Sequence, residues 1–253
     1  MKYLLFPLRF LYVIYTLALF VAIMFILFPF FIVASWGGPV RGANYMIRLC
    51  TLWADCWMFL VGMPHCNIFE VPHDFKKPYI YVANHLSYID AVLLVKSIRK
   101  NFRPLGRAET AKIPLFGFIY RRAIVTVDRS DPKNRAASVS RLKALLRKGV
   151  SIFVFPEGTF NMTAAPLKSF YDGAFRIAIE TGTPIKPLLF LDAYHRMHYS
   201  HPTSIKPGQS RAVFLEEINV EGYTLEQLPQ LKARVMHLME EKLRSYHASW
   251  ISS

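Results

Sequence analysis

The pattern of hydrophobic and polar positions divides the chain into an apolar N-terminal part and a longer part of short, alternating segments. Residues 10–40 contain no charged side chain, a run longer than the roughly 20 residues that cross a bilayer as a helix. A signal peptide fits this run less well, because its apolar core covers about 7–15 residues before a small-residue cleavage site. Pro29 predicts a kink, which would permit a tilted or re-entrant helix.

A second apolar segment covers residues 43–61 and contains Arg48 and Asp55 as its charged residues. Its Trp and Met content leaves three interpretations open: the second half of a membrane hairpin, a helix in the membrane interface, or an amphipathic helix packed on the following domain. The boundary predicted from these segments places membrane-anchoring helices in residues 1–62 and a second domain in residues 63–253.

The second domain shows the alternation of strand and helix patterns that is typical of an α/β fold. The predicted strands cover residues 79–83, 123–127, 151–155, 185–191 and 212–218. The predicted helices cover residues 88–98, 134–148, 174–180 and 228–246. The helices at 134–148 and 228–246 each carry an apolar stripe, which predicts that they pack on a sheet.

A histidine and a carboxylate follow the strand pattern at residues 79–83. Residues 84–90 read Asn-His-Leu-Ser-Tyr-Ile-Asp. Open α/β sheets bind ligands beyond the carboxyl ends of their strands, so His85 lies where a catalytic base is expected. The five-residue spacing favours His85 in a turn and Asp90, which can orient the ring, in the first turn of the next helix. The alternative is a helix-capping box made by Ser87 and Asp90.

A second polar turn follows the strand pattern at residues 151–155. Residues 153–159 read Phe-Val-Phe-Pro-Glu-Gly-Thr. The Glu157 carboxylate at the tip of this turn is able to bind a hydroxylated ligand, to tune a base, or to hold the backbone amides of its own loop.

The two turns, in this order and about seventy residues apart, resemble the 1-acylglycerol-3-phosphate (lysophosphatidic acid) acyltransferase family, which carries N-H-x-S-x-x-D and then F-P-E-G-T. Two further blocks support the resemblance: Gly-Arg-Ala-Glu-Thr at 106–110 and Thr-Pro-Ile-Lys-Pro at 183–187. The resemblance runs from roughly residue 78 to residue 191. It implies an α/β fold with a mixed sheet flanked by helices, preceded by a membrane-embedded helix or helical hairpin.

The resemblance also implies an activity: transfer of a fatty acyl group from an acyl thioester to the hydroxyl of a lysophospholipid. The donor would be acyl-CoA or acyl carrier protein, and 1-acyl-glycerol-3-phosphate would become phosphatidic acid. His85 matches the general base and Asp90 its supporting carboxylate, and no cofactor is needed. The implied substrate-binding residues are Ser87, Arg107, Glu157, Gly158, Thr159 and Lys168.

The chain departs from the family pattern at cationic positions that are expected to contact an acceptor phosphate. Phe160 and Tyr171 stand where the family usually has an arginine and a lysine, and Arg107 replaces a lysine. The cations available to compensate are Lys168, Arg121, Arg122 and Arg129. Two alternatives therefore stay open: the same chemistry on another acceptor, such as the lyso-aminolipid lyso-ornithine lipid, or a non-catalytic lipid-binding membrane protein.

The charge balance favours a membrane over a nucleic acid. Lys and Arg number 31 against 17 Asp and Glu, for a net charge of +14. This surplus favours anionic lipids or a phosphorylated acyl carrier, and no zinc-finger or RNA-recognition pattern points to nucleic acid. The three cysteines lack C-x-x-C spacing, and the histidines at 195, 198 and 201 lack partners, so no metal site is expected. We expect a protein of the inner (cytoplasmic) membrane whose catalytic domain faces the cytoplasm.

Overall fold

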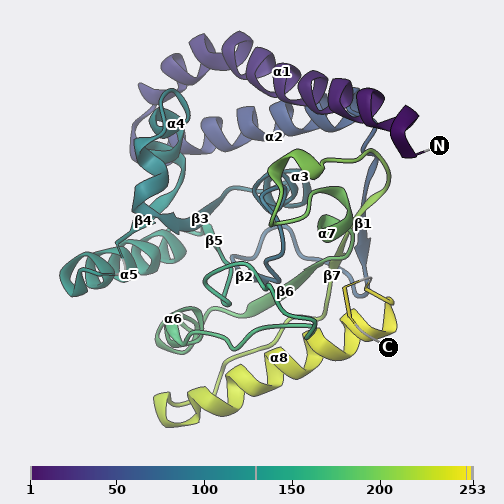
Figure 1. The fold of residues 1–253 in the computed structure, drawn as a ribbon. Helices are drawn as coiled ribbons and strands as arrows, with labels where there is room; N and C mark the ends of the chain where they lie inside the picture. Colours follow the sequence, from purple (N-terminus) through teal and green to yellow (C-terminus); the bar gives the residue numbers. More distant parts are fainter. Residues whose placement is uncertain (1, 129, 249, 252–253) are drawn as a thin grey trace.

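A mixed seven-stranded sheet lies at the centre of the structure, a computed structural model that describes residues 2–128, 130–248 and 250–251 (Figure 1). The strand order is β1-β7-β6-β2-β5-β3-β4. The strands are β1 (His65–Phe69), β2 (Ile80–Ala83), β3 (Phe102–Arg107), β4 (Val125–Val127), β5 (Ser151–Val154), β6 (Ile185–Phe190) and β7 (Ser210–Phe214). Neighbouring strands are parallel except for β6 and β7, so β7 and β1 run opposite to the other five.

Helices cover both faces of this sheet, as the mixed α/β prediction required (Figure 1). The helices are α1 (Lys2–Ser35), α2 (Ala43–Leu60), α3 (Asp90–Ser97), α4 (Phe116–Ala123), α5 (Pro132–Arg147), α6 (Gly173–Thr181), α7 (Ala193–Arg196) and α8 (Leu228–Ser245). One apolar cluster joins the sheet to α2 and α3, and a second joins its other face to α5, α6 and α8. The predicted fold class is therefore confirmed.

The strand predictions succeeded where apolar residues run together and failed elsewhere. The central strands β2, β5 and β6 are buried along their whole length, which explains their continuous apolar sequences. The sequence pattern missed β1, β3 and α4. Strand β3 reads Phe-Arg-Pro-Leu-Gly-Arg, a composition typical of a loop, and is a strand because it pairs with β5 and β4. The strand predicted from residue 123 begins at Val125, because Ala123 is the last residue of α4.

Helix α1 continues through Pro29, so the predicted kink does not divide it and no re-entrant segment is present within the described part of this helix. Its 34 residues correspond to about 51 Å of helix. Within the described residues, its segment Pro7–Ser35 is the one helix long and apolar enough to cross a membrane. Large apolar side chains remain exposed along it from Leu8 to Val33, and Trp36 beyond its end is 79% exposed.

Helices α1 and α2 form a hairpin that is closed by a glycine turn. A Cβ on Gly42 would lie 2.4 Å from the carbonyl oxygen of Ala34, so this close approach requires glycine. The tryptophans of α2 bind α1 rather than a membrane interface: Trp57 Nε1 donates to the Thr16 carbonyl at 2.9 Å, and Trp53 Nε1 donates to the Phe20 carbonyl at 3.2 Å. The interfacial interpretation of residues 43–61 does not hold for these side chains.

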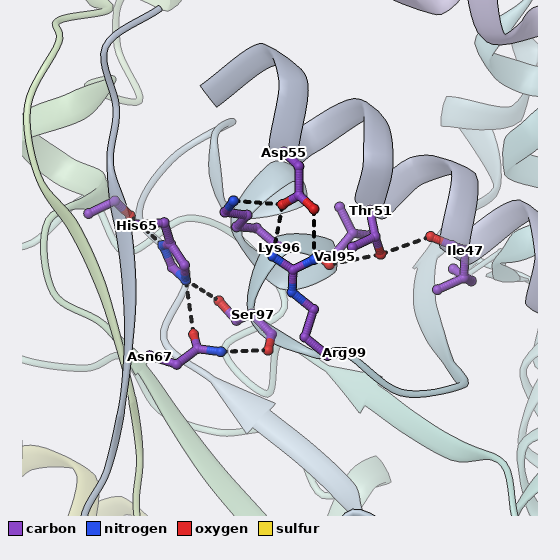
Figure 2. Close-up of polar contacts among 10 residues, drawn as sticks. Ile47, Thr51, Asp55, His65, Asn67, Val95, Lys96, Ser97 and Arg99 are labelled. Atoms are coloured by element: carbon purple, nitrogen blue, oxygen red, sulfur yellow. Dashed lines mark hydrogen bonds and ion pairs between the residues drawn. The ribbon is translucent and has the colours of Figure 1, made fainter. Parts of the chain in front are cut away.

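Helix α2 also packs on the α/β part, as one of the three interpretations proposed (Figure 2). The Asp55 carboxylate of α2 accepts hydrogen bonds from both Nη atoms of Arg99, at 2.7 and 2.8 Å, and from Lys96 Nζ at 2.6 Å. Thr51 donates to the Val95 carbonyl of α3. Residues 1–62 and 63–253 thus share one apolar cluster, and the division between them remains a prediction.

We expect the substitution Asp55→Asn to destabilise the protein by about 1 kcal/mol. The substitution removes the negative charge from the partly exposed, bidentate ion pair of Asp55 with Arg99. The midpoint of thermal unfolding in detergent micelles should fall by roughly 2–4 °C. Glu226, an exposed carboxylate without an ion pair in the described chain, provides the control Glu226→Gln, which should leave the midpoint unchanged. Equal midpoints for Asp55→Asn and the control would contradict a role for the Asp55 contacts.

Candidate active site

The carboxyl ends of β2 and β5 place the two predicted turns next to each other. These strands are parallel neighbours, with Val82 opposite Val154. The chain after β2 enters α3 on one face of the sheet, whereas the chain after β5 leads to α6 on the other face. Such a topological switch point is where open α/β sheets bind their ligands. The sequence could not show this adjacency, because β5 follows β3 and β4 in the chain but lies between β2 and β3 in the sheet.

His85 and Asp90 form a pair in the turn between β2 and α3. The His85 Nδ1 atom lies 2.8 Å from Asp90 Oδ2, and the Asp90 side chain is fully buried. The same Oδ2 atom accepts the backbone N–H groups of Leu86 and Ser87, at 2.7 and 2.9 Å. A carboxylate only accepts hydrogen bonds, so Nδ1 carries the proton and the lone pair of the neutral ring is on Nε2.

The capping interpretation of this turn is correct in part. Asp90 accepts the Ser87 N–H, and the Ser87 hydroxyl accepts the Ile89 N–H at 3.2 Å. The Ser87 hydroxyl also donates to the Met197 carbonyl. Asp90 therefore holds the turn and the His85 ring with the same oxygen atom, so the two roles proposed for it are compatible.

Glu157 is fully buried and joins the two turns. Its Oε1 accepts the His85 N–H and its Oε2 accepts the Lys168 N–H, both at 2.8 Å. Burial raises the pKa of Glu157 to about 7, although these two N–H donors oppose the rise. Three roles were considered for Glu157 from the sequence, and these hydrogen bonds show one of them: the carboxyl group holds backbone amides. Gly158 next to it has φ of +73°, a conformation that favours glycine.

Aromatic rings enclose the His85 imidazole. Phe155 stacks on it at 3.8 Å between ring centroids, and Phe160 meets it edge-on at 4.5 Å. Tyr88 in turn contacts Phe160, at 4.8 Å. The sequence identified Phe160 as a departure from the family pattern but did not identify Phe155 and Tyr88, because aromatic residues beside a strand are more often core.

A cavity of about 550 Å³ opens in front of the His85 ring. Five of the predicted site residues line it: His85, Ser87, Arg107, Gly158 and Thr159. Three do not line it. Asp90 and Glu157 are buried behind the two turns, and Lys168 lies beside them with its Nζ donating to Thr159 Oγ1 at 2.7 Å.

Arg107 is the cation that lines this cavity within the described chain, and its side chain is 63% exposed. The other cations proposed to compensate lie elsewhere. Arg121 donates to the Ala111 carbonyl, and Arg122 lies over the Phe118 ring at 3.8 Å. Arg129 lies outside the described residues. Within those residues, no group of three or more His, Cys, Asp and Glu side chains converges as a metal site would require.

A second, apolar cavity of about 280 Å³ adjoins the first. Residues of α3, β3 and α4 line both cavities, among them Leu94, Pro104 and Tyr120, together with Tyr88 in the turn before α3. The far walls of the apolar cavity come from the N-terminal hairpin, with Phe20 and Met24 from α1 and Trp53 from α2. The space in front of the histidine thus adjoins an apolar space that reaches the N-terminal hairpin.

Comparison with known proteins matches the family described as Acyltransferase to residues 66–191, about half of the chain. Both motif turns and all the predicted site residues lie in that range. The chain belongs to this acyltransferase family. The resemblance inferred from the two motifs is therefore confirmed.

Several curated relatives of this chain are named 1-acyl-sn-glycerol-3-phosphate acyltransferase. The chloroplastic protein of Arabidopsis thaliana is 31% identical over 143 residues, 56% of this chain and 40% of that protein. The Haemophilus influenzae protein is 28% identical over 178 residues, 69% of this chain and 72% of that protein. The match to the Arabidopsis protein thus spans less than half of that relative.

The fold of the chain matches that of a solved structure. The crystal structure of the 1-acyl-sn-glycerophosphate acyltransferase of Thermotoga maritima superposes with a TM-score of 0.74 at 21% sequence identity. The superposition covers 96% of this chain and 100% of that one. The shared fold therefore includes the N-terminal helices as well as the sheet.

The raised pKa of Glu157 predicts a specific dependence of stability on pH. The folded protein holds a proton at Glu157 up to a pH of about 7, whereas an unfolded glutamate releases it near pH 4.3. The stability contributed by this group is therefore fully present below about pH 4.3 and is lost as the pH rises through about 7.

The variant Glu157→Gln tests this dependence. A glutamine side chain does not titrate, so the unfolding midpoint of the variant should change less than that of the wild type between about pH 5 and pH 8. Its amide nitrogen would face a backbone N–H, so we also expect a loss of about 1–3 kcal/mol of stability. Thermal unfolding in detergent across this pH range measures both effects. If the unfolding midpoints of variant and wild type change in parallel with pH, Glu157 does not have a raised pKa in the folded protein.

Proposed function

We propose that this protein transfers a fatty acyl group from an acyl thioester to the hydroxyl of a lysophospholipid, with 1-acyl-glycerol-3-phosphate as acceptor and phosphatidic acid as product. One observation carries the proposal: the imidazole of the His85–Asp90 pair lines a cavity that shares a wall with a second, apolar cavity. A hydroxyl acceptor needs a base, and a fatty acyl chain needs an apolar space. The names of the curated relatives support this choice of acceptor.

In the proposed reaction, His85 Nε2 takes the proton of the acceptor hydroxyl as its oxygen attacks the thioester carbonyl carbon. Asp90 holds Nδ1 and stabilises the imidazolium ion that forms. The tetrahedral intermediate then expels the thiolate, which recovers the proton from Nε2. The new C–O bond replaces the C–S bond, so no acyl-enzyme and no cofactor are required.

The oxyanion of this intermediate needs N–H donors. The amides of His85, Leu86 and Ser87 are bound to the two carboxylates, so they are not available. Thr159 and Phe160 line the cavity, and within the described chain their backbone amides have no hydrogen-bond acceptor. We infer that these two amides supply the donors.

We also propose that the protein lies in the inner membrane, with residues 1–62 as the anchor and the catalytic domain on the cytoplasmic side. The exposed apolar side chains of α1 support a membrane setting. The apolar cavity reaches this helix, so a lipid acyl chain would enter the site from the bilayer. The donor would be acyl-CoA or acyl carrier protein.

The variant His85→Ala should lose about 10²- to 10⁴-fold in turnover, because it removes the general base. Thiol release from acyl-CoA in detergent micelles with lysophosphatidic acid measures this loss, and acyl carrier protein donors follow if acyl-CoA is inert. The matched control is His195→Ala, an exposed histidine outside both cavities, which should keep full turnover. If the His85→Ala protein is folded and keeps its full biological activity, the proposed acyl-transfer mechanism is wrong and a non-catalytic lipid-binding protein is favoured.

A second acceptor class is favoured by the wall of the cavity. Phe160 and Tyr88 present aromatic surface next to His85, and Arg107 provides the lining cation. This wall suits an acceptor without a phosphomonoester, such as a lyso-aminolipid, whose ammonium group would contact the ring faces.

The choice between the two acceptor classes is tested with Phe160→Arg. A new guanidinium should raise the rate with lysophosphatidic acid, relative to zwitterionic and lyso-aminolipid acceptors, by about tenfold. Phe160→Leu, which removes the ring without adding charge, is the control. Wild-type activity confined to lysophosphatidic acid would exclude the lyso-aminolipid class.

A further inference from the structure

A pocket of about 140 Å³ lies where the turn between α1 and α2 meets the α/β part, and it shares Ile124 with the wall of the His85 cavity. The start of β3, the junction of α4 and β4, and one side of α5 form its other walls. Strand β3 separates the two sites: Arg103 near its start lines this pocket, and Arg107 at its end lines the His85 cavity. Four residues of strand correspond to about 13 Å.

Among the described residues, four cations and no acidic residue line this pocket: Arg103, Arg122, Arg141 and Lys148. Within the same part of the chain, none of the four forms an ion pair. Like charges gathered in one pocket repel one another and create a positive potential that attracts an anion. Arrangements of guanidinium and ammonium groups of this kind match the oxygens of a phosphate.

Arg103 makes the pocket more than a patch of surface cations, because it is only 2% exposed. Its guanidinium donates to uncharged acceptors: the carbonyls of Phe102 and Val40, and Asn44 Oδ1 at 2.7 Å. Burial and the nearby Arg141 lower the pKa of Arg103 to about 10. A buried guanidinium without a carboxylate partner is expensive, and an external anion in this pocket would offset that cost.

We propose that this pocket binds the phosphate of an anionic phospholipid at a site separate from the acyl-transfer centre. The surroundings favour a lipid as the source of the phosphate. The α1–α2 turn is one wall of the pocket, and Trp36 in that turn is 79% exposed beside the apolar outer face of α1. Tryptophan is enriched where membrane and water meet. The remaining lining is apolar, with Val40, Val125 and Leu145, which suits contact with the acyl chains of a lipid.

The test uses the full chain in neutral detergent micelles, with phosphatidylglycerol, phosphatidylcholine or inorganic phosphate added. The thermal-unfolding midpoint and the lipid retained in native mass spectrometry report binding. The pocket variant is Arg141→Gln with Lys148→Gln, because both residues are exposed and the fold is not at risk as it is with Arg103. The matched control, Lys133→Gln with Arg147→Gln, removes the same charge from the same helix outside the pocket.

Phosphatidylglycerol should bind the wild type and the control alike, and the pocket variant about tenfold or more weakly. Phosphatidylcholine should bind none of them at this site. Equal losses in control and pocket variant would show general charge attraction and overturn the proposal. Inorganic phosphate that binds as tightly as the lipid would overturn the lipid as source. Binding of an acidic acyl carrier protein but no lipid, lost in the pocket variant, would assign the pocket to a protein partner instead.

Discussion

The arrangement of the site depends on one atom, Oδ2 of Asp90, which accepts three N–H groups. Two come from the backbone of the turn and one from the His85 ring. The conformation of the turn and the orientation of the imidazole are therefore set by the same carboxylate, and neither can change without the other. Full burial of Asp90 strengthens these hydrogen bonds, because charge-assisted contacts gain in a medium of low dielectric constant.

Because β2 and β5 are neighbouring strands, the turn after β5 also helps to hold His85 in place. Glu157 binds the His85 amide, and the Asn161 N–H returns to the His85 carbonyl at 2.7 Å. On the other side, Asn84 exchanges two hydrogen bonds with the backbone of Phe190 in β6. His85 is thus fixed through the strands on both sides of β2, which is the preorganisation that the proposed general base would need.

Much of this could be predicted from the sequence, for identifiable reasons. The spacing from His85 to Asp90 was sufficient to place one in a turn and the other in the first turn of a helix, because local geometry decides that. The position of Glu157 next to His85 was not predictable from periodicity, since it depends on a strand order created by long-range pairing. The contacts of Lys168 were not predictable either: its amide holds Glu157 and its ammonium group binds Thr159, while its role at the substrate stays a prediction. Strand β3 escaped detection because pairing, not composition, makes it a strand.

The hairpin of α1 and α2 presents exposed apolar side chains on its outside and forms a wall of the apolar cavity. Helix α2 also joins the core beneath α3, whose first residue is Asp90. The sequence of a segment that only tethers a domain can change without any effect on a cavity elsewhere in the protein. Here the exposed apolar side chains of α1 and the cavity-lining Phe20 and Met24 lie on the same helix, so a substitution that changes the outer surface of the hairpin can also change the wall of the cavity.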